Sequence, residues 1–162
     1  MAYRALDEKS IIDYLLEVPE IRAFFGTDNL VAEEVGDGNL NYVYIVASEK
    51  DPEKSLIVKQ AVPYLRCVGE EYPLSKDRMS YEIRSLQRYN DLAGAYVPTV
   101  HFADEEMSLV AMDHLNDHVI MRKGMIDANK YFKFADHISS FLADTLFKTS
   151  SQIGRASCRE RV

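Results

Sequence analysis

The sequence lacks several features that would assign it to a specialised class of protein. It has no Trp. Its 162 residues include only 2 Cys, too few for a disulfide scaffold. No apolar run approaches the ~20 residues that span a bilayer, and residues 1–9 contain no apolar stretch of the kind a signal peptide needs. We therefore expect no membrane association and a reducing, cytoplasmic environment.

An excess of basic residues is also lacking. The 26 Asp and Glu outnumber the 19 Lys and Arg, which gives a formal net charge of −7. Nonspecific nucleic-acid binding depends on Lys and Arg side chains that displace counterions from phosphates, so we expect no nucleic-acid partner. Any anionic ligand has to be held by a few local groups. The 4 His are scattered without the spacing of metal ligands, and no metal site is predicted.

The length of the chain matches one domain, but its last ten residues differ from the rest. Residues 153–162 are rich in Arg and look like the translation of one reading frame of a sequencing adapter. We interpret them as a non-native tail that is not part of the fold. On this interpretation the coding sequence is cut near Gln152. Cys67 is then the only natural cysteine, and it is interpreted as structural because nothing nearby in the sequence activates its thiol.

Hydrophobic periodicity predicts alternating helices and strands. Asp7 and Ser10 are suitable caps for the first helix, and Pro19 ends it. The predicted elements are, in order, a helix around residues 11–16, a β-hairpin over 31–46, a strand at 56–62, a polar loop at 69–74, a helix from an N-cap at Ser75 to about residue 90, two strands at 97–102 and 107–112 joined by a solvated acidic turn at 104–106, and a helix of about five turns over 131–146.

This order of elements predicts the fold class. Strands joined by short turns cannot be parallel neighbours, so the sheet is expected to be antiparallel. The predicted class is α+β, and a doubly wound dinucleotide fold is disfavoured.

The turn of the predicted hairpin contains two glycines. Gly36 and Gly38 lie between two strands rather than before a helix, and Asn41 stands where a dinucleotide fingerprint needs a third glycine. One interpretation is an ordinary hairpin turn that uses Gly and Asn for positive φ. The other is a flap whose backbone N–H groups lie over a polyphosphate.

A charged residue interrupts the apolar strand at 56–62. A buried and unpaired ammonium at Lys59 would cost several kcal/mol, so we expect it either to reach water from an edge strand or to have a partner. Glu82 lies within the apolar stripe of the following helix, so its carboxylate should face the sheet and supply that partner. A glycine turn, a strand lysine and a helical glutamate in this order are the parts of a kinase small lobe.

Four strings of residues carry a more specific resemblance. Residues 34–41 (EVGDGNLN), 57–64 (IVKQAVPY), 66–70 (RCVGE) and 122–126 (RKGMI) resemble 5-methylthioribose kinases, in the same order, and the resemblance runs from about residue 31 to 150. The family is similar in fold to protein kinases and to aminoglycoside and choline phosphotransferases. The resemblance implies transfer of the γ-phosphate of ATP to the anomeric hydroxyl of 5-methylthioribose, giving 5-methylthioribose 1-phosphate in methionine salvage.

The resemblance also implies an organisation and a set of site residues. Residues 1–112 would form a kinase-like small lobe, 113–117 the hinge and 118–152 the start of the large helical lobe. The cofactors implied are ATP and Mg²⁺. The ATP-binding residues implied are the phosphate flap Gly36, Asp37, Gly38, Asn39 and Asn41, the α/β-phosphate ligand Lys59, its ion-pair partner Glu82, and the adenine hinge Asp113, His114 and Leu115.

The catalytic aspartate and the Mg²⁺ ligands of this fold lie in the large lobe, and no His-x-Asp string followed by a metal-binding acid occurs here. We therefore expect this chain to be a truncated nucleotide-binding lobe that is inactive alone, and the full-length enzyme to be a homodimer. Tyr72 stands where the family has Trp. Two alternatives stay open: a related phosphotransferase with another acceptor, and a noncatalytic ligand-binding or interaction module.

Overall fold

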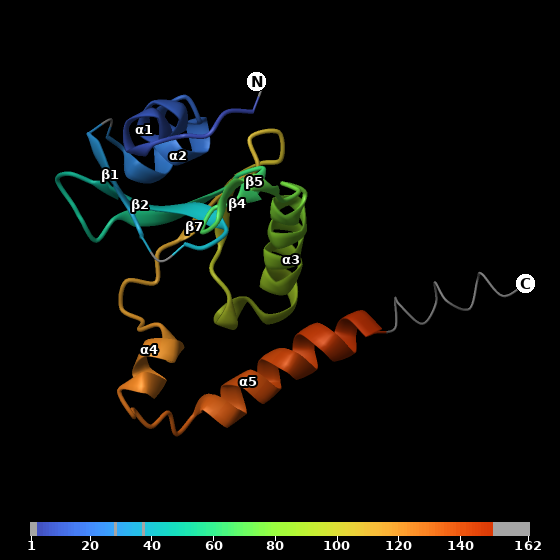
Figure 1. Ribbon diagram of the computed structural model, residues 1–162. Coiled ribbons are helices and arrows are strands. Elements are labelled where there is room, and N and C mark those ends of the chain that lie inside the picture. The colour runs from blue at the N-terminus through green and yellow to red at the C-terminus, as the bar shows by residue number, and fades with distance from the viewer. Residues whose placement is uncertain (1–2, 28, 37, 151–162) are drawn as a thin grey trace, which may run out of the picture.

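The computed structural model of the chain describes residues 3–27, 29–36 and 38–150. It contains five α-helices and seven strands within these ranges, together with two short helical turns (Figure 1). The helices are α1 (Glu8–Leu16), α2 (Pro19–Phe25), α3 (Arg78–Ala93), α4 (Met121–Ile126) and α5 (Phe134–Leu142). The strands are β1 (Leu30–Glu34), β2 (Asn41–Ser48), β3 (Ser55–Ala61), β4 (Tyr64–Leu65), β5 (Gly69–Pro73), β6 (Val100–Asp104) and β7 (Leu109–Asp113).

Five strands form the main sheet, in the order β1-β2-β3-β7-β6, and every neighbouring pair is antiparallel. These pairings confirm the predicted α+β class with an antiparallel sheet. Strand β3 lies in the middle of the sheet, with β2 paired on one edge and β7 on the other. The arrangement is that of a kinase-like small lobe.

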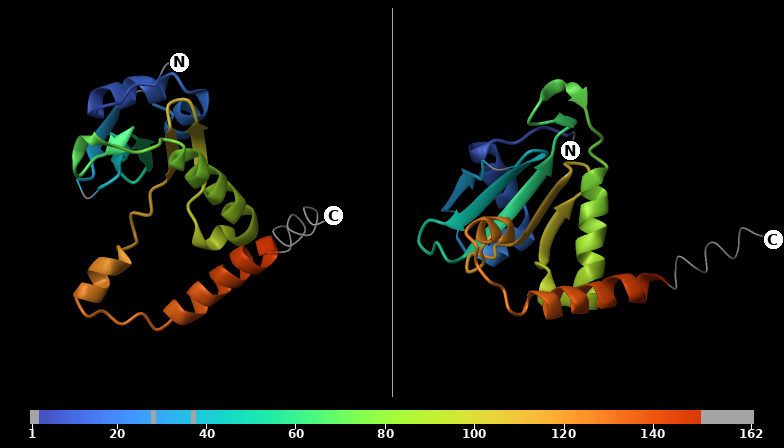
Figure 2. Two further views of the ribbon diagram at one scale, coloured as in Figure 1. Left: turned by 45° about the vertical axis from the view of Figure 1, so that its right-hand side comes forward. Right: turned by 60° about the horizontal axis from the view of Figure 1, so that its bottom comes forward.

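The two faces of the sheet are covered to different extents (Figures 1 and 2). Helices α1 and α2 pack over one face, where Tyr44, Val46, Leu56 and Val58 are buried. Helix α3 packs on the other face against β3, β6 and β7. The alternation of side chains along a strand accounts for this division. Helix α3 covers only part of its face of the sheet, and Val43 and Ile45 of β2 are only half-buried on that face.

A buried polar residue attaches the N-terminal segment to the sheet. The Gln60 side chain is fully buried; its Oε1 accepts from the Leu6 N–H at 2.9 Å, and its Nε2 donates to the Arg4 carbonyl at 2.8 Å and the Met107 carbonyl at 3.1 Å. The Tyr44 hydroxyl donates to the Leu6 carbonyl at 2.7 Å. The amide of Gln60 therefore satisfies three backbone groups that α1 and the sheet would otherwise bury without partners.

The first helix begins as the sequence predicts. Asp7 and Ser10 form a reciprocal capping box, in which each side chain accepts from the backbone N–H of the other. Pro19 ends this helical run but is also the first residue of α2, a helix that was not predicted. Proline is well suited to that position because the first N–H of a helix has no partner within the helix.

Two predictions near the middle of the chain are wrong. The segment 69–74 is not only a loop, because residues 69–73 form β5 and pair with β4 despite their weak strand propensity. The N-cap of α3 is Asp77 rather than Ser75. The Ser75 hydroxyl instead accepts from the Asp77 N–H at 3.1 Å and stabilises the turn before the helix.

Three further differences lie nearer the C-terminus. Asp104 is the last residue of β6 rather than part of a solvated turn, and its carboxylate accepts from the Tyr14 hydroxyl at 2.6 Å. The last long helix begins at Phe134 instead of Tyr131 and continues as a π-helical turn over Ala143–Phe147. Helix α4 was not predicted; its six residues are too few to show helical periodicity.

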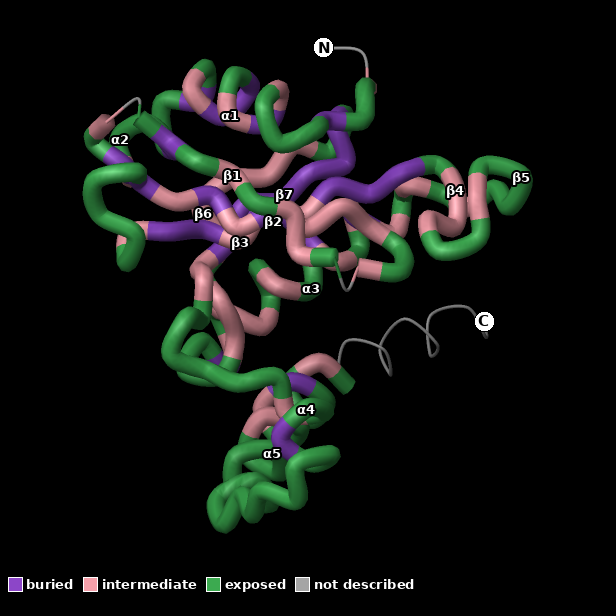
Figure 3. Tube along the Cα trace, turned by 60° about the vertical axis from the view of Figure 1, so that its left-hand side comes forward, coloured by how far each residue is buried: buried purple, intermediate pink, exposed green. Residues whose placement is uncertain are grey.

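The segment that carries α4 and α5 is poorly covered (Figure 3). Phe132 is 90% exposed and Phe147 is 80% exposed. Tyr89 of α3 and Tyr96 of the short helical turn after it contact Phe141 of α5. Isolated exposed apolar residues are ordinary, but a run of them favours association with other surfaces. In the ranges that the structure describes, no helix combines the length and apolar character needed to cross a membrane.

Replacement of Gln60 tests the attachment of the N-terminal segment. Gln60→Leu removes three hydrogen bonds and leaves buried backbone groups unsatisfied, so we expect the free energy of unfolding to fall by about 2–4 kcal/mol. Urea denaturation followed by circular dichroism measures this change. Gln87→Leu, on an exposed position of α3, is the matched control and should shift stability by no more than about 0.5 kcal/mol. Equal effects of the two substitutions would contradict the structural role of Gln60.

Candidate nucleotide-binding site

The central feature of the site is an ion pair between the sheet and α3. Lys59 Nζ donates to Glu82 Oε1 at 2.9 Å, as predicted from the sequence. The alternation along β3 puts Ile57, Lys59 and Ala61 on the face that α3 covers, and Glu82 lies one helical turn before Leu86 on the facing side of α3. The structure therefore brings together two residues that are 23 positions apart in the sequence.

The exposure of this pair limits what it does for folding. The Lys59 and Glu82 side chains are 32% and 31% exposed, and a solvent-screened pair of this kind contributes only about 0–1 kcal/mol to stability. The ammonium has three N–H donors, and within the described residues Glu82 is its only hydrogen-bond partner. Lys59 is thus held in place with donors left over for an anionic ligand.

The glycine turn between β1 and β2 does not use positive φ at its described glycines. Neither Gly36 nor Gly38 has a positive φ, so that interpretation of the turn is wrong for these two residues. Asp37 lies outside the described residues. A Cβ at Gly38 would lie 2.6 Å from the Asn41 carbonyl oxygen, whereas a Cβ at Gly36 would meet no atom within 4 Å. The chain itself requires a glycine at 38, and Gly36 borders open space.

The turn is held from one side by the β4–β5 hairpin. Arg66 Nη1 donates to the carbonyls of Gly38 and Asn41, both at 3.3 Å, and its Nη2 pairs with the Glu34 carboxylate. The Arg66 guanidinium also lies 4.3 Å from the centre of the Tyr42 ring, a cation–π contact. These contacts, which sequence reasoning missed, tie the hairpin to the glycine turn.

The next residue along the hairpin also reaches the turn. The backbone N–H of Cys67 donates to the Asn39 carbonyl at 3.1 Å, and both residues are exposed. The structural role assigned to Cys67 therefore belongs to its backbone, and its thiol faces solvent.

A second arginine holds the turn from the side of α3. Arg78 donates from Nε and Nη2 to Asn41 Oδ1, at 3.2 and 3.0 Å. Its Nη2 also donates to the carbonyls of Leu40 and Val62, each at 2.9 Å. Burial lowers the pKa of the Arg78 guanidinium from its ordinary value, which indicates partial desolvation. Sequence reasoning missed Arg78 because four of its acceptors are main-chain carbonyls or a distant amide.

The three residues predicted to form the hinge lie at the end of β7 and directly after it. Asp113 belongs to β7 itself, where its carboxylate accepts from the Thr99 N–H at 2.8 Å and contacts His101 Nε2 at 2.6 Å. Burial alone would raise the pKa of Asp113, but the hydrogen bonds from His101 and Thr99 outweigh it and lower that pKa. His114 Nδ1 lies 2.8 Å from Ser55 Oγ. The side chains of Asp113 and His114 are therefore occupied within the small lobe.

Leu115 follows these two residues and is exposed. It lines a cavity of about 590 Å³, which is bordered by the segment that follows β7 and by α5. The other lining residues are Ala95, Tyr96, Val97, His118 and His137. The backbone of this connection is itself bonded at two points: the Asp113 N–H donates to the Thr99 carbonyl at 3.0 Å, and the Leu115 carbonyl accepts from the His118 N–H at 3.1 Å.

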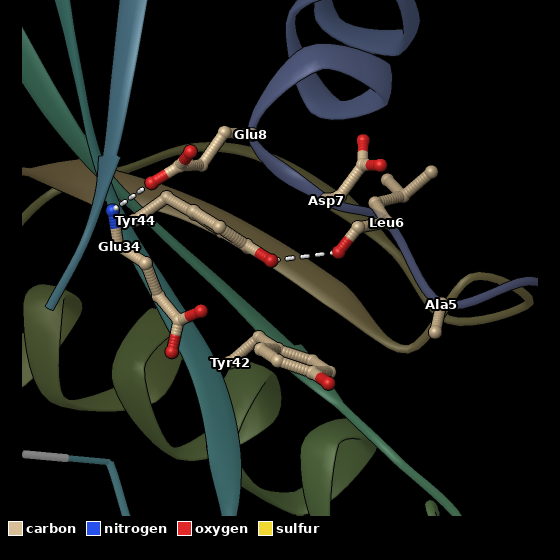
Figure 4. Close-up of a pocket in the computed structure, with 7 residues that line it drawn as sticks. All are labelled: Ala5, Leu6, Asp7, Glu8, Glu34, Tyr42 and Tyr44. Atoms are coloured by element: carbon tan, nitrogen blue, oxygen red, sulfur yellow. Dashed lines mark hydrogen bonds between the residues drawn. The ribbon is translucent and has the colours of Figure 1, made fainter. Parts of the chain in front are cut away.

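A separate cavity of about 390 Å³ lies on the opposite face of the sheet (Figure 4). Its polar groups serve the protein itself: Glu8 Oε1 accepts from the Glu34 N–H at 3.1 Å, and the Tyr44 hydroxyl is bonded to Leu6. Tyr42 and Tyr44 stack at 6.1 Å beside them. This cavity marks the line along which the N-terminal segment joins the sheet, and it is not part of the Lys59 site.

The residues around Lys59 fit a nucleotide better than a metal ion. Val43, Ile45 and Ile57 offer half-buried apolar surface on the same face as the ammonium, and Gly36 leaves space for close approach of a ligand. Over the part of the chain that the structure describes, no group of three or more His, Cys, Asp or Glu is placed to hold a metal.

Comparison with known proteins shows what the chain is similar to. Methylthioribose kinase 1 of Oryza sativa subsp. japonica is 42% identical over 151 residues, which cover 91% of this chain and 34% of the rice protein. Methylthioribose kinase of Bacillus thuringiensis (strain Al Hakam) is 41% identical over 162 residues, which cover 100% of this chain and 39% of the bacterial protein. The chain is homologous to the N-terminal part of methylthioribose kinases. It spans 34–39% of the length of these relatives, and no protein-family model matches it.

The two glycines of the turn provide a matched pair of substitutions. Gly38→Ala places a methyl group against the Asn41 carbonyl, so we expect a loss of about 1–3 kcal/mol in the free energy of unfolding. Gly36→Ala meets no atom and should change stability by no more than about 0.5 kcal/mol. Thermal or urea denaturation of both variants measures the difference. A larger loss for Gly36→Ala than for Gly38→Ala would show that the turn is built differently.

Proposed function

We propose that this chain is the nucleotide-binding lobe of an ATP-dependent kinase that phosphorylates the anomeric hydroxyl of 5-methylthioribose in methionine salvage. The observation that carries the proposal is the Lys59–Glu82 pair, which lies on the partly uncovered face of the sheet. The homology with methylthioribose kinases supports the choice of acceptor. For the whole protein we propose 5-methylthioribose and ATP as substrates, Mg²⁺ as the metal and a homodimer as the assembly.

Each residue of the site has a role that follows from its chemistry. ATP, when bound, supplies the γ-phosphoryl group. The Lys59 ammonium neutralises charge on phosphate oxygens, and Glu82 keeps that ammonium pointed at the site instead of at solvent. The open space at Gly36 lets the backbone of the turn approach the phosphates closely. We assign contacts with the adenine edge to those main-chain groups of residues 113–115 that the protein itself does not use; the Asp113 N–H donates to the Thr99 carbonyl, and the Leu115 carbonyl accepts from the His118 N–H.

The remaining chemistry belongs to a part of the protein outside this chain. Phosphoryl transfer needs an aspartate that orients the acceptor hydroxyl and acidic residues that hold Mg²⁺. The described residues offer no such acidic cluster. We propose that these groups lie in the region that corresponds to the rest of the relatives' length, and that the present chain binds nucleotide without catalysing transfer.

Removal of the lysine tests nucleotide binding directly. Lys59→Ala removes a charge-assisted contact with phosphate, which is worth about 1.5–3 kcal/mol, so ATP affinity should fall by about tenfold or more. Isothermal titration of ATP into this chain measures the affinity. Lys50→Ala, on the exposed turn between β2 and β3, is the matched control and should bind like the unmodified chain. ATP binding that does not depend on Lys59 would favour the noncatalytic alternative.

The choice of acceptor is tested on a longer protein. A chain extended to the length of the relatives should consume ATP in the presence of 5-methylthioribose and form a sugar phosphate, because it then carries the missing acidic groups. A coupled assay of ADP release, with product identified by mass spectrometry, measures this reaction. Turnover with an amino alcohol or another sugar, but not with 5-methylthioribose, would show that the acceptor is wrong.

A further inference from the structure

We propose that Arg78 is a positioning residue that fixes the side-chain amide of Asn41 with its two N–H donors directed to a nucleotide phosphate. This inference deepens the proposed function and rests on it. Its basis is the set of hydrogen bonds that Arg78 makes to Asn41 Oδ1, Leu40 O and Val62 O at 2.9–3.2 Å.

The chemistry of the guanidinium decides the orientation of the amide. An amide side chain can usually be turned by 180° because its oxygen and nitrogen are similar in shape. A guanidinium has five donors and no acceptor, so it can bond only the oxygen of Asn41. Two of its N–H groups converge on that oxygen. The Nδ2 group of Asn41 is thereby left as a donor, and it has no hydrogen-bond partner among the residues that the structure describes.

Arg78 is itself rigidly held. Its Nη1 donates to the Ser75 carbonyl at 2.6 Å, and its Nη2 binds carbonyls at the beginning of β2 and just beyond the end of β3. The bonds to Asn41 and Val62 are partly buried, where hydrogen bonds are stronger than in water, and those to Ser75 and Leu40 are exposed. The guanidinium therefore joins the first turn of α3 to the start of β2, which follows the glycine turn, and to the end of β3.

The fixed amide of Asn41 lies near Lys59, on the same face of the sheet. Asn41 pairs with Ala61 and Val43 pairs with Lys59 across β2 and β3, so Asn41 and Lys59 are diagonal neighbours on the same face. Such neighbours are separated by about 7–8 Å, a span that a polyphosphate can bridge. Glu82, which holds Lys59, lies one helical turn after Arg78 on α3. One helix face thus positions both a cationic and a neutral donor for adjacent phosphates.

Two substitutions of Asn41 separate phosphate contact from structural support. Asn41→Asp keeps an oxygen for Arg78 but loses both N–H donors, and Asn41→Leu loses the donors without adding charge. We expect both to weaken ATP binding by about tenfold while adenosine binding changes by less than about twofold. We also expect Asn41→Asp to unfold at the same urea concentration as the unmodified chain or a higher one. Asn29→Asp, at an exposed position just before β1, is the control for added charge and should bind ATP normally.

Substitution of Arg78 tests the positioning role itself. Arg78→Lys keeps the charge but cannot hold the amide and two carbonyls together, so ATP affinity should fall by about threefold to tenfold, with adenosine affinity unchanged. The measurement is isothermal titration of ATP and of adenosine into each variant of this chain. ATP affinity within twofold of the unmodified chain for Arg78→Lys or for Asn41→Leu would overturn the inference. Equal losses of ATP and adenosine affinity would also overturn it, because they would indicate distortion of the whole pocket.

The same experiment distinguishes this inference from the proposed function. If Lys59→Ala loses ATP affinity while the Asn41 and Arg78 variants keep it, the nucleotide site stands and the positioning role is wrong. If the unmodified chain binds ATP no better than Lys59→Ala does, the proposed function fails, and the inference fails with it.

Discussion

The alternation of side chains along β3 is the constraint on which the rest of the structure depends. Successive residues of a strand point to opposite faces of the sheet, and in β3 two polar residues, Lys59 and Gln60, are adjacent. Lys59 turns to the α3 face, where it meets Glu82. Gln60 turns to the other face and bonds the segment that leads into α1. A shift of one residue in the register of β3 would exchange these environments and bury an ammonium among the residues that α1 and α2 cover.

The glycine turn is better described as a supported structure than as a free flap. Arg66 from the β4–β5 hairpin and Arg78 from α3 approach it from two sides and bond carbonyls at residues 38, 40 and 41. Both arginines also contact side chains. Arg66 lies against the Tyr42 ring, and Arg78 donates to the amide oxygen of Asn41. At Gly36 an added Cβ would meet no atom within 4 Å, so this part of the turn borders open space.

The sequence predicted those parts of the fold and of the site that leave a periodic signal. The strands of the main sheet and the pairing of Lys59 with Glu82 follow from alternation and from helical spacing, and both are confirmed. Gln60, Arg66 and Arg78 could not be found in this way. Their partners include main-chain carbonyls 16 to 56 residues distant, and such acceptors carry no sequence identity. The β4–β5 pairing was missed for a related reason: neither strand has a hydrophobic alternation of its own.

The N-terminal segment has a consequence for how this protein can be prepared in the laboratory. The Tyr3 hydroxyl donates to the Ala61 carbonyl at 3.0 Å, and the Lys76 ammonium lies 3.4 Å from the centre of the Tyr3 ring. These residues therefore reach the end of β3 and the approach to α3 from the far side of the sheet. Trimming the first six residues to obtain a shorter recombinant protein would remove the Arg4 and Leu6 partners of Gln60 and loosen the strand that also carries the Lys59 ammonium.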